Sequence, residues 1–256
     1  MSLDDVVKKL NKLILLNKKI PEEERMLQME KLTPDRKKIM SEERRGIVKK
    51  LESGGYSSNA ELRKDLKKIG FDLSWEILRD FNLRGLDFSS VNFSVADVSG
   101  ANFSGCNLSN ADFSISACLN TNFSSATMQN ANFSMANCSG ADFSAANLLM
   151  SVFTACVATG TNFMSSNLAS SDFTNSVLRN ARFEGANTIG IILNNCILEG
   201  TIFEGRGGEM AERESKKYQI EAERLYDNLS EAREYLSQDS GYHSSGEKYR
   251  QKREYR

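Results

Sequence analysis

The side chains that could carry acid-base or nucleophilic chemistry are few in this 256-residue chain, and they lie far apart. Its single histidine, His243, stands in a polar C-terminal segment, and no cysteine or carboxylate cluster recurs around it. The nearby Ser237, Ser240 and Ser244 lack the strand-turn-helix context that a nucleophile elbow requires. We therefore interpret His243 as a solvated surface imidazole and predict no catalytic residues.

The cysteines and glycines indicate neither a metal site nor a cofactor site. No C-x-x-C pair and no histidine partner accompanies the cysteines, so a zinc-type ligand set is missing from the sequence. The segment Gly205-Arg206-Gly207-Gly208 lacks the lysine and hydroxyl positions of a phosphate-binding loop and is more simply a flexible exit. We predict no metal and no cofactor. The five cysteines are Cys106, Cys118, Cys138, Cys156 and Cys196.

Carboxylates do recur, but their separations are multiples of five residues. They are Asp87, Asp97, Asp112, Asp142 and Asp172. At the equivalent places in neighbouring units the residue is usually Asn, which has the shape of Asp without its acidity. This exchange favours a structural role in a repeated turn over acid-base machinery.

The spacing belongs to a five-residue repeat that continues from residue 81 to residue 205 without an insertion. The central position i, at 83 + 5n, is usually Phe, Leu or another apolar residue; position i−2 is usually small, and position i−1 is usually Asn or Asp. A period of five fits neither the 3.6 of a helix nor the 2 of a flat strand. Self-similarity at a fixed period predicts stacked structural units.

Typical units are Ala101-Asn102-Phe103-Ser104, Ala111-Asp112-Phe113-Ser114 and Ala141-Asp142-Phe143-Ser144. The sequence resembles the pentapeptide repeat family, whose members carry A-[DN]-[LF]-x-x in tandem. The resemblance implies a right-handed quadrilateral parallel β-helix, with i and i−2 pointing inward. It also implies a surface-binding function, because several family members bind type II topoisomerases such as gyrase as mimics of duplex DNA.

If four units make one coil, residues twenty apart become vertical neighbours, separated by about 4.8 Å. Six coils then give a solenoid of roughly 29 Å. The large centres form two ladders on opposite walls, and we expect large side chains to face small ones across the core. One ladder is Phe103, Phe123, Phe143, Phe163, Phe183 and Phe203, and the other is Phe93, Phe113, Phe133, Phe153 and Phe173. The cysteines fall at i or i−2, so we expect buried thiols and no disulfide between Cys118 and Cys138.

The flanks of the repeat are rich in charge and helical in pattern, which makes the chain an all-β solenoid (81–205) flanked by α-helical N- and C-terminal regions (1–80 and 206–256). Residues 3–19 and a segment after Pro21 predict two helices. Thr33-Pro34-Asp35 predicts the start of a third that ends at Gly54-Gly55. A shorter helix is expected from a cap at Asn59 to Gly70. A last turn capped by Ser74 would bring Phe71, Trp75 and Leu78 against the first coil.

The C-terminal end of the repeat carries apolar residues at an outward position, because i−1 becomes Ile192, Ile197 and Ile202. We expect another segment of the chain to cover these residues. The sequence predicts an amphipathic helix over residues 209–237 with an a/d-like apolar stripe. This helix either covers the end of the repeat or pairs with another chain, including a second copy in a homodimer. Residues 242–256 are a polar tail or a short helix.

The charge of the chain excludes several classes of partner. There are 33 basic and 34 acidic side chains, so no global field favours nucleic acid, and direct nucleic-acid binding is not expected. No apolar run approaches a membrane span, and residues 1–5 lack a secretory pattern. A bacterial, cytoplasmic protein is the first expectation, and a secreted effector acting on host proteins is an alternative.

The charge of the solenoid also bears on mimicry of DNA. Residues 81–205 carry a net charge of −5, whereas duplex DNA of that length carries on the order of 17 charges.

The outward positions turn apolar in one region, and this region predicts a site for a protein partner. The candidate patch is Ile115, Met135, Leu149, Met150, Val152 and Val157. We therefore predict a non-enzymatic protein-protein interaction scaffold that uses the outer faces of the solenoid. The alternative is a DNA mimic that binds type II topoisomerase. Scattered surface residues of the kind any protein shows remain the plain explanation of the patch.

Overall fold

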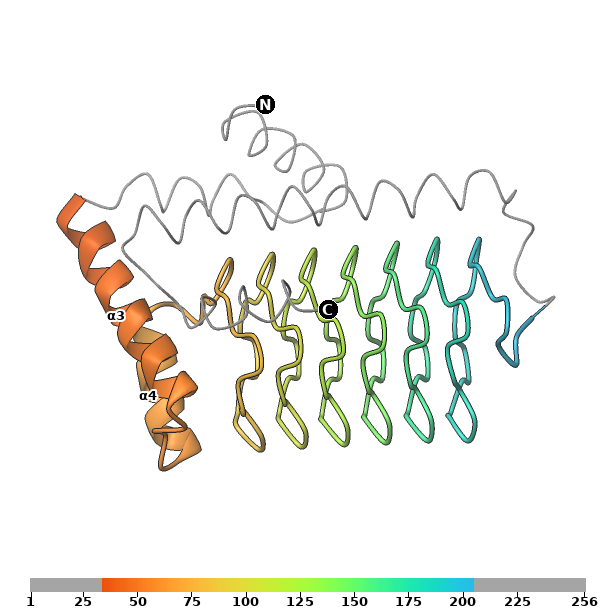
Figure 1. The fold of residues 1–256 in the computed structure, drawn as a ribbon, viewed down its shortest axis with the longest axis horizontal. Helices are drawn as coiled ribbons and strands as arrows, with labels where there is room; N and C mark the ends of the chain where they lie inside the picture. Colours follow the sequence, from red (N-terminus) through yellow and green to blue (C-terminus); the bar gives the residue numbers. More distant parts are fainter. Residues whose placement is uncertain (1–33, 205–256) are drawn as a thin grey trace, which may run out of the picture. The chain divides into compact units, whose positions relative to one another are not determined.

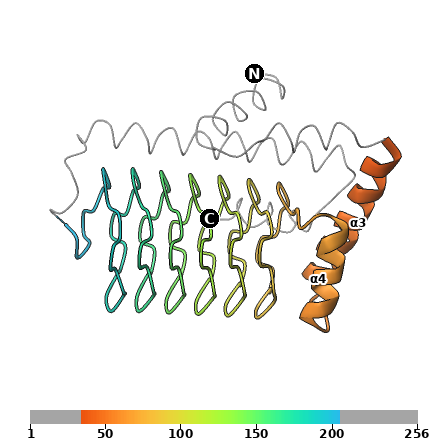
Figure 2. The same cartoon turned by 180° about the vertical axis from the view of Figure 1, so that it is seen from behind.

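The computed structural model describes residues 34–204, with side chains from residue 42 onward. Two helices, α3 (Pro34–Glu52) and α4 (Asn59–Lys68), come first, and stacked coils follow them, as Figure 1 and the rear view of Figure 2 show. The helices expected before residue 34, the helix expected over residues 209–237, the polar tail and His243 lie outside the described residues.

Helix α3 has the limits that the sequence predicts. Pro34 is its first residue, where the missing N–H of proline is no loss. After Glu52 the chain turns through Gly54, whose φ of 65° suits a residue without Cβ. The amides of Gly54 and Gly55 donate to the carbonyls of Leu51 and Lys50 at 3.1 and 2.8 Å, which satisfies the last turn of the helix.

Helix α4 is capped by Ser58 and not by Asn59, so the predicted cap is wrong by one residue. Ser58 is extended (φ −156°, ψ 155°), and its Oγ accepts a hydrogen bond from the Glu61 amide at 3.3 Å. Asn59 is already helical, and its side chain bonds elsewhere. The helix gives way at Ile69 and at Gly70, whose φ is 63°.

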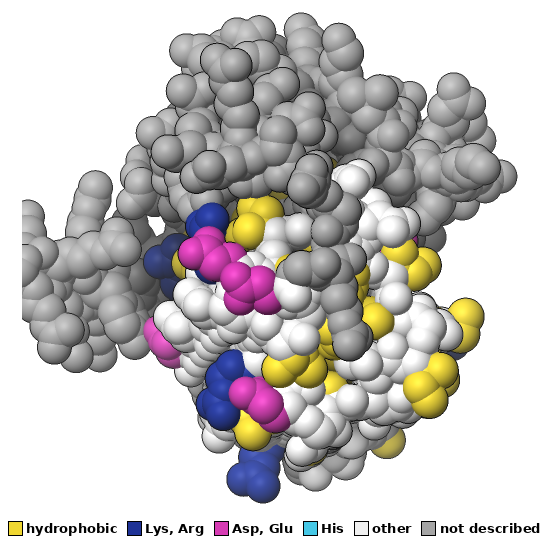
Figure 3. Space-filling model, turned by 90° about the vertical axis from the view of Figure 1, so that its right-hand side faces the viewer, with side chains coloured by type: hydrophobic (Ala, Val, Ile, Leu, Met, Phe, Trp, Pro, Cys, Tyr) yellow, Lys and Arg dark blue, Asp and Glu magenta, His cyan; other side chains and the backbone are white. Residues whose placement is uncertain are grey.

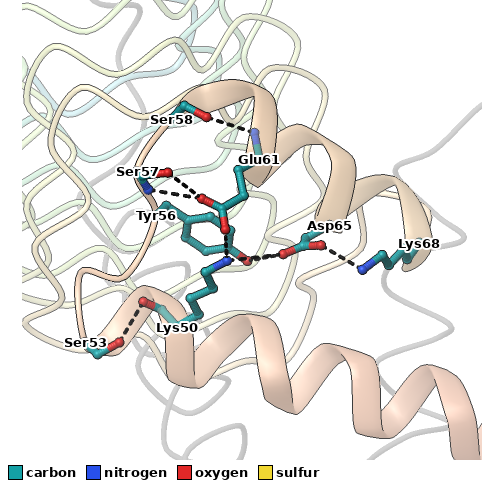
Figure 4. A network of polar contacts seen from close by, with 8 residues as sticks. All are labelled: Lys50, Ser53, Tyr56, Ser57, Ser58, Glu61, Asp65 and Lys68. Carbon is teal, nitrogen blue, oxygen red and sulfur yellow. Dashed lines mark hydrogen bonds and ion pairs between the residues drawn. The ribbon is translucent and has the colours of Figure 1, made fainter.

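The two helices are joined by Lys50, as Figure 4 shows. Its ammonium group donates to Glu61, lies 3.8 Å from Asp65 Oδ2 and sits 4.4 Å from the centre of the Tyr56 ring. The hydrogen bond from Lys50 lowers the pKa of Glu61. The Tyr56 hydroxyl donates to Asp65 at 3.3 Å. Beneath this network the apolar faces are buried, namely Ile47, Val48 and Leu51 of α3 and Leu62 and Leu66 of α4.

The repeat forms a solenoid in which residues twenty apart are paired. Parallel bridges run from Asp72↔Asn92 to Val177↔Ile197, one at position i−1 of each unit, so four units make one coil. Each wall of the described coils contributes single bridge residues and no longer strand, because two residues of every five form the corner turn. The solenoid is thus confirmed, while its right-handed sense stays a prediction.

The paired coils begin earlier than residue 81. Asp72 and Ile77 already bridge to Asn92 and Asp97, so units 71–75 and 76–80 belong to the first coil. The expected last helical turn capped by Ser74 is therefore wrong: Ser74 lies in a corner turn of the first unit. In these units Phe71 and Glu76 occupy i−2, where a small residue is usual, as Phe81 and Leu86 do in the next two units.

The phenylalanine rings fill the core in two stacked ladders. Along one ladder the centroid of Phe123 lies 5.4 Å from that of Phe103 and 4.8 Å from that of Phe143, with interplanar angles of 18° and 12°. The rings from Phe88 to Phe173 are fully buried. Offset stacking of this kind adds to simple burial of apolar area.

The expectation that large side chains face small ones across the core is wrong. Phe143 meets Phe133 and Phe153 of the opposite ladder edge to face, at 5.3 and 5.6 Å and at 89° and 86°. The positive edge of one ring lies against the negative face of the other, which makes a large-to-large contact favourable. The smaller centres, such as Cys138 and Leu148, occupy the other two walls.

Candidate interaction surface

The backbone amides and carbonyls of each wall form hydrogen bonds with the same wall of the neighbouring coils. The Phe143 amide donates to the Asn162 carbonyl at 2.7 Å, the Ala145 amide to Met164 at 2.9 Å, and the Asn162 amide back to Ala141 at 2.9 Å. The same pattern recurs in the coils between the first and the last. A partner that approaches a wall from outside therefore meets side chains and not a free strand edge.

The corner turns fix which side chains the surface can carry. The second turn residue, i+2, has a positive φ in every unit from Trp75 to Gly200. Glycine and asparagine accept this left-handed conformation readily, whereas a β-branched residue there is strained. Val95 and Ile115 nevertheless have φ values of 63° and 60°, and Met150 has 57°.

The repeat aspartates have the structural role that the sequence predicts. Asp142 Oδ1 accepts the Ser144 amide at 2.9 Å and the Asn162 side-chain amide, one coil further on, also at 2.9 Å. Asp142 thus holds its own turn and ties two coils together. The amide at i+1 is held in the same way by Asp87, Asp97, Asp112 and Asp172.

At the N-terminal end, α4 supplies hydrogen bonds that a preceding coil would otherwise make. Asn59 Oδ1 accepts the amide of Asp87 at 2.8 Å, and its Nδ2 donates to the Gly85 carbonyl at 3.4 Å. One turn later, Arg63 Nη1 donates to the Ser89 carbonyl at 2.5 Å. These contacts cover an edge that would otherwise present unpaired backbone groups.

The cysteines are free, buried thiols. Burial raises the pKa of Cys106 and Cys156 to about 12 and that of Cys196 to about 11. Burial and the neighbouring Cys118 thiol raise the pKa of Cys138. A thiol that resists ionisation is a poor nucleophile and a poor metal ligand. Within the described residues, no group of His, Cys, Asp and Glu could hold a metal ion.

The predicted partner patch falls at two corners. Leu149, Met150 and Val152 lie at the corner between the wall centred on Leu148 and the wall centred on Phe153. Ile115, Met135 and Val157 lie at the next corner along the coil. The six therefore lie at two neighbouring corners.

The two corners also differ in exposure. Met150 is 57% exposed, and Leu149 and Val152 are half-buried. At the other corner Ile115 is only 4% exposed, while Met135 and Val157 are half-buried. The surface open to a partner thus includes Met150 and excludes Ile115.

Ile189, which the predicted patch omits, is the most exposed large apolar side chain of the described residues, at 77%. It stands two coils beyond Leu149 in the same column, since 189 − 149 = 40, and the twenty-residue register could have identified it. Ile192, two coils beyond Val152, is 40% exposed, and Ile202 is 60% exposed. Figure 3, seen from the right-hand side of Figure 1, shows hydrophobic side chains standing out on a mostly uncharged surface.

This fold and this surface define a repeat solenoid whose outer walls differ in chemistry from place to place. A family model for a pentapeptide repeat region matches residues 126–203, and one for pentapeptide repeats (8 copies) matches residues 72–105 and 106–137. Together they span more than half of the chain. The chain belongs to the pentapeptide repeat proteins. A comparison with curated proteins gives no match.

Similar solved structures are pentapeptide repeat proteins too. A structure of QnrB1, a plasmid-mediated fluoroquinolone resistance protein, is 16% identical, with 51% of this chain and 84% of that one covered and a TM-score of 0.35. A thylakoid-lumen pentapeptide repeat protein of Arabidopsis thaliana is 26% identical, with 40% of this chain and 68% of that one covered and a TM-score of 0.32. HetL of Nostoc, which is involved in heterocyst differentiation regulation, is 17% identical, with 51% of this chain and 90% of that one covered and a TM-score of 0.20. Among the described residues no helix is long and apolar enough to cross a membrane.

Proposed function

We propose that this chain is a non-enzymatic protein-binding scaffold that captures a protein partner on the outer walls of its solenoid. The observation that carries the proposal is the exposure of Met150 and Ile189, at 57% and 77%. The inward ladders already bury the residues that hold the coils together. Large apolar side chains left in water on such a frame are typical of a binding surface.

The binding surface proposed here is the corner patch, which consists of Leu149, Met150, Val152, Ile189 and Ile192. Leu149 and Ile189 share one column, and Met150 occupies the turn beside Leu149. Val152 and Ile192 share a column of the adjoining wall through their bridges to Asp172. The patch therefore extends over three successive coils along one corner.

Affinity capture with the full-length chain tests this proposal. The double variant Met150→Asp with Ile189→Asp places two charges on the patch, and we expect it to lose the partner while its melting temperature is kept. The control is Leu119→Asp with Asn120→Asp, at the equivalent turn of the opposite corner, where Leu119 is 39% exposed. Identical captured proteins from both variants would contradict the proposal.

A DNA mimic that binds type II topoisomerase is the second reading of the same outer surface. The net charge of −5 over residues 81–205 is small against the roughly 17 charges of duplex DNA of similar length. Recovery of a gyrase subunit in the capture experiment would favour this second reading. The proposal takes the bacterial cytoplasm as its setting, and cell fractionation tests that part.

A further inference from the structure

The corner patch surrounds one carboxylate, Asp172, whose environment differs from that of the other repeat aspartates. Asp72, Asp87, Asp112 and Asp142 each accept a hydrogen bond from an asparagine side chain twenty residues later, at 3.2, 3.1, 3.0 and 2.9 Å. Asp97 instead binds Arg79 Nε at 2.6 Å. Each of these carboxylates has a donor from another unit of the solenoid.

Asp172 lacks such a donor because position 192 holds an isoleucine. Its Oδ1 accepts the amide and the hydroxyl of Thr174, at 2.8 and 2.6 Å. Within residues 42–204, its Oδ2 makes no hydrogen bond and no ion pair. A carboxylate between apolar neighbours is partly shielded from water, so an incoming cation is attracted more strongly there than on an open surface.

The neighbours of Asp172 form a regular column. Val152 bridges to Asp172, and Asp172 bridges to Ile192, so an apolar, an acidic and an apolar side chain follow one another along the wall. Successive steps are about 4.8 Å, which puts the two apolar residues roughly 10 Å apart.

We propose that this column binds an amphipathic α-helix of a partner protein that carries a lysine or arginine between two apolar residues. The proposal rests on the protein-binding function proposed above. In a helix, residues i and i+7 lie about 10.5 Å apart on one face, and i+3 or i+4 lies midway between them. Apolar residues at i and i+7 reach Val152 and Ile192, and the basic residue between them reaches Asp172.

A helix fits this wall better than an extended peptide because the backbone of the wall is already paired. The amides of Val152, Asp172 and Ile192 donate to the coil before them, at 2.9 to 3.0 Å. The carbonyls of Asp172 and Ile192 accept the Phe153 and Phe173 amides at 2.7 and 2.9 Å. Adding a strand needs a free edge, whereas a helix docks through side chains alone.

Selection from a phage-displayed library of random 16-residue peptides, with the full-length protein as bait, tests the inference. We expect at least tenfold enrichment of peptides with large apolar residues seven apart and Lys or Arg three or four places after the first. The bait Asp172→Asn keeps the oxygen that accepts from Thr174 and removes the charge, and the basic preference should vanish with it. Asp142→Asn, at the same repeat position of the opposite wall, is the matched control and should keep the preference.

Three results would overturn the inference. The first is selected peptides with apolar residues three apart, as in an extended peptide. The second is no preference for a basic residue, and the third is the same basic preference with the Asp172→Asn bait. The double variant Met150→Asp with Ile189→Asp serves as a third bait. Peptides that bind the native chain but not this double variant, and show no basic preference, would leave the proposed function intact and remove only the helix inference. Equal pools from the native chain and the double variant would contradict both.

Discussion

Phe143 is the residue at which the packing of the solenoid is tested most directly. Its ring is fully buried and stacks on Phe123 and Phe163, with centroids at 4.8 and 5.2 Å. It also meets Phe133 and Phe153 edge to face, at 5.3 and 5.6 Å. Removing the ring therefore breaks four aromatic contacts at once.

The change Phe143→Ala should cost about 4–5 kcal/mol of unfolding free energy. Burial and the cavity left behind account for about 3–5 kcal/mol in changes of this type. Each aromatic pair contributes about 0.5–1.5 kcal/mol beyond its area, which places a ring with four partners in the upper part of that range. Stacked coils on both sides limit how far the walls can close over the cavity.

Guanidinium unfolding, followed by circular dichroism and by hydrogen exchange, measures this loss. Two probes are needed because a stack of repeats can unfold in stages, which would make a single free energy ill-defined. The control Phe143→Leu keeps most of the apolar volume and removes only the ring, and it should cost about half as much. A loss below about 1.5 kcal/mol for Phe143→Ala, or equal losses for both variants, would refute the account of the core.

Three further outcomes are expected. Glu76→Gln should raise the guanidinium midpoint at pH 7, because burial raises the pKa of Glu76 and so disfavours its carboxylate. The gain should shrink as the pH falls through the raised pKa of Glu76 toward the ordinary value of 4.5, and an equal gain at pH 4 and pH 7 would contradict this cause. Ser125→Val should cost about 1–2 kcal/mol, because φ at this residue is 56°, whereas Ser124→Val, one residue earlier, should cost little; thermal melts of the two variants compare them. Asn59→Ala should lower the unfolding free energy by about 1–2 kcal/mol and speed hydrogen exchange in the first coil. Lys64→Ala, at an exposed residue of the same helix, should do neither.

The register of the solenoid could be predicted from the sequence because the central residue of every five-residue unit must point inward. That rule places Phe103, Phe123 and Phe143 in one ladder before any coordinates are known. The rule also holds in the first coil, where the centres Leu73 and Leu78 are buried, but Phe71 and Glu76 replace the small residue that is usual at i−2. Pairing with the next coil holds these units in place.

The contact between the two phenylalanine ladders was also contained in the sequence. Centres ten residues apart lie on opposite walls, so Phe133 and Phe143 had to face each other. The expectation that large side chains face small ones considered only side-chain volume, whereas the packing of this core is set by the geometry of ring contacts. Edge-to-face contact lets two large side chains share a narrow interior.

Exposure of the outer residues could not be predicted from periodicity. Ile115 and Met150 share position i+2, yet they are 4% and 57% exposed. The repeat fixes only the direction of a side chain, and burial depends on what lies beyond the wall. The register does identify Ile189 and Ile192 as column partners of Leu149 and Val152, and it predicts which apolar residues line up along a corner.

Met150 shows why stability of the solenoid alone does not explain this surface. Its φ of 57° costs a residue with a Cβ about 1–2 kcal/mol, a cost that glycine or asparagine at the same turn largely avoids. A side chain that remains 57% exposed recovers little of that cost by packing within its own chain. The core ladders show the opposite balance, because there the burial of each ring contributes to the fold. Under the proposed function, a partner that covers Met150 and Ile189 supplies the apolar contacts that Met150 lacks within its own chain.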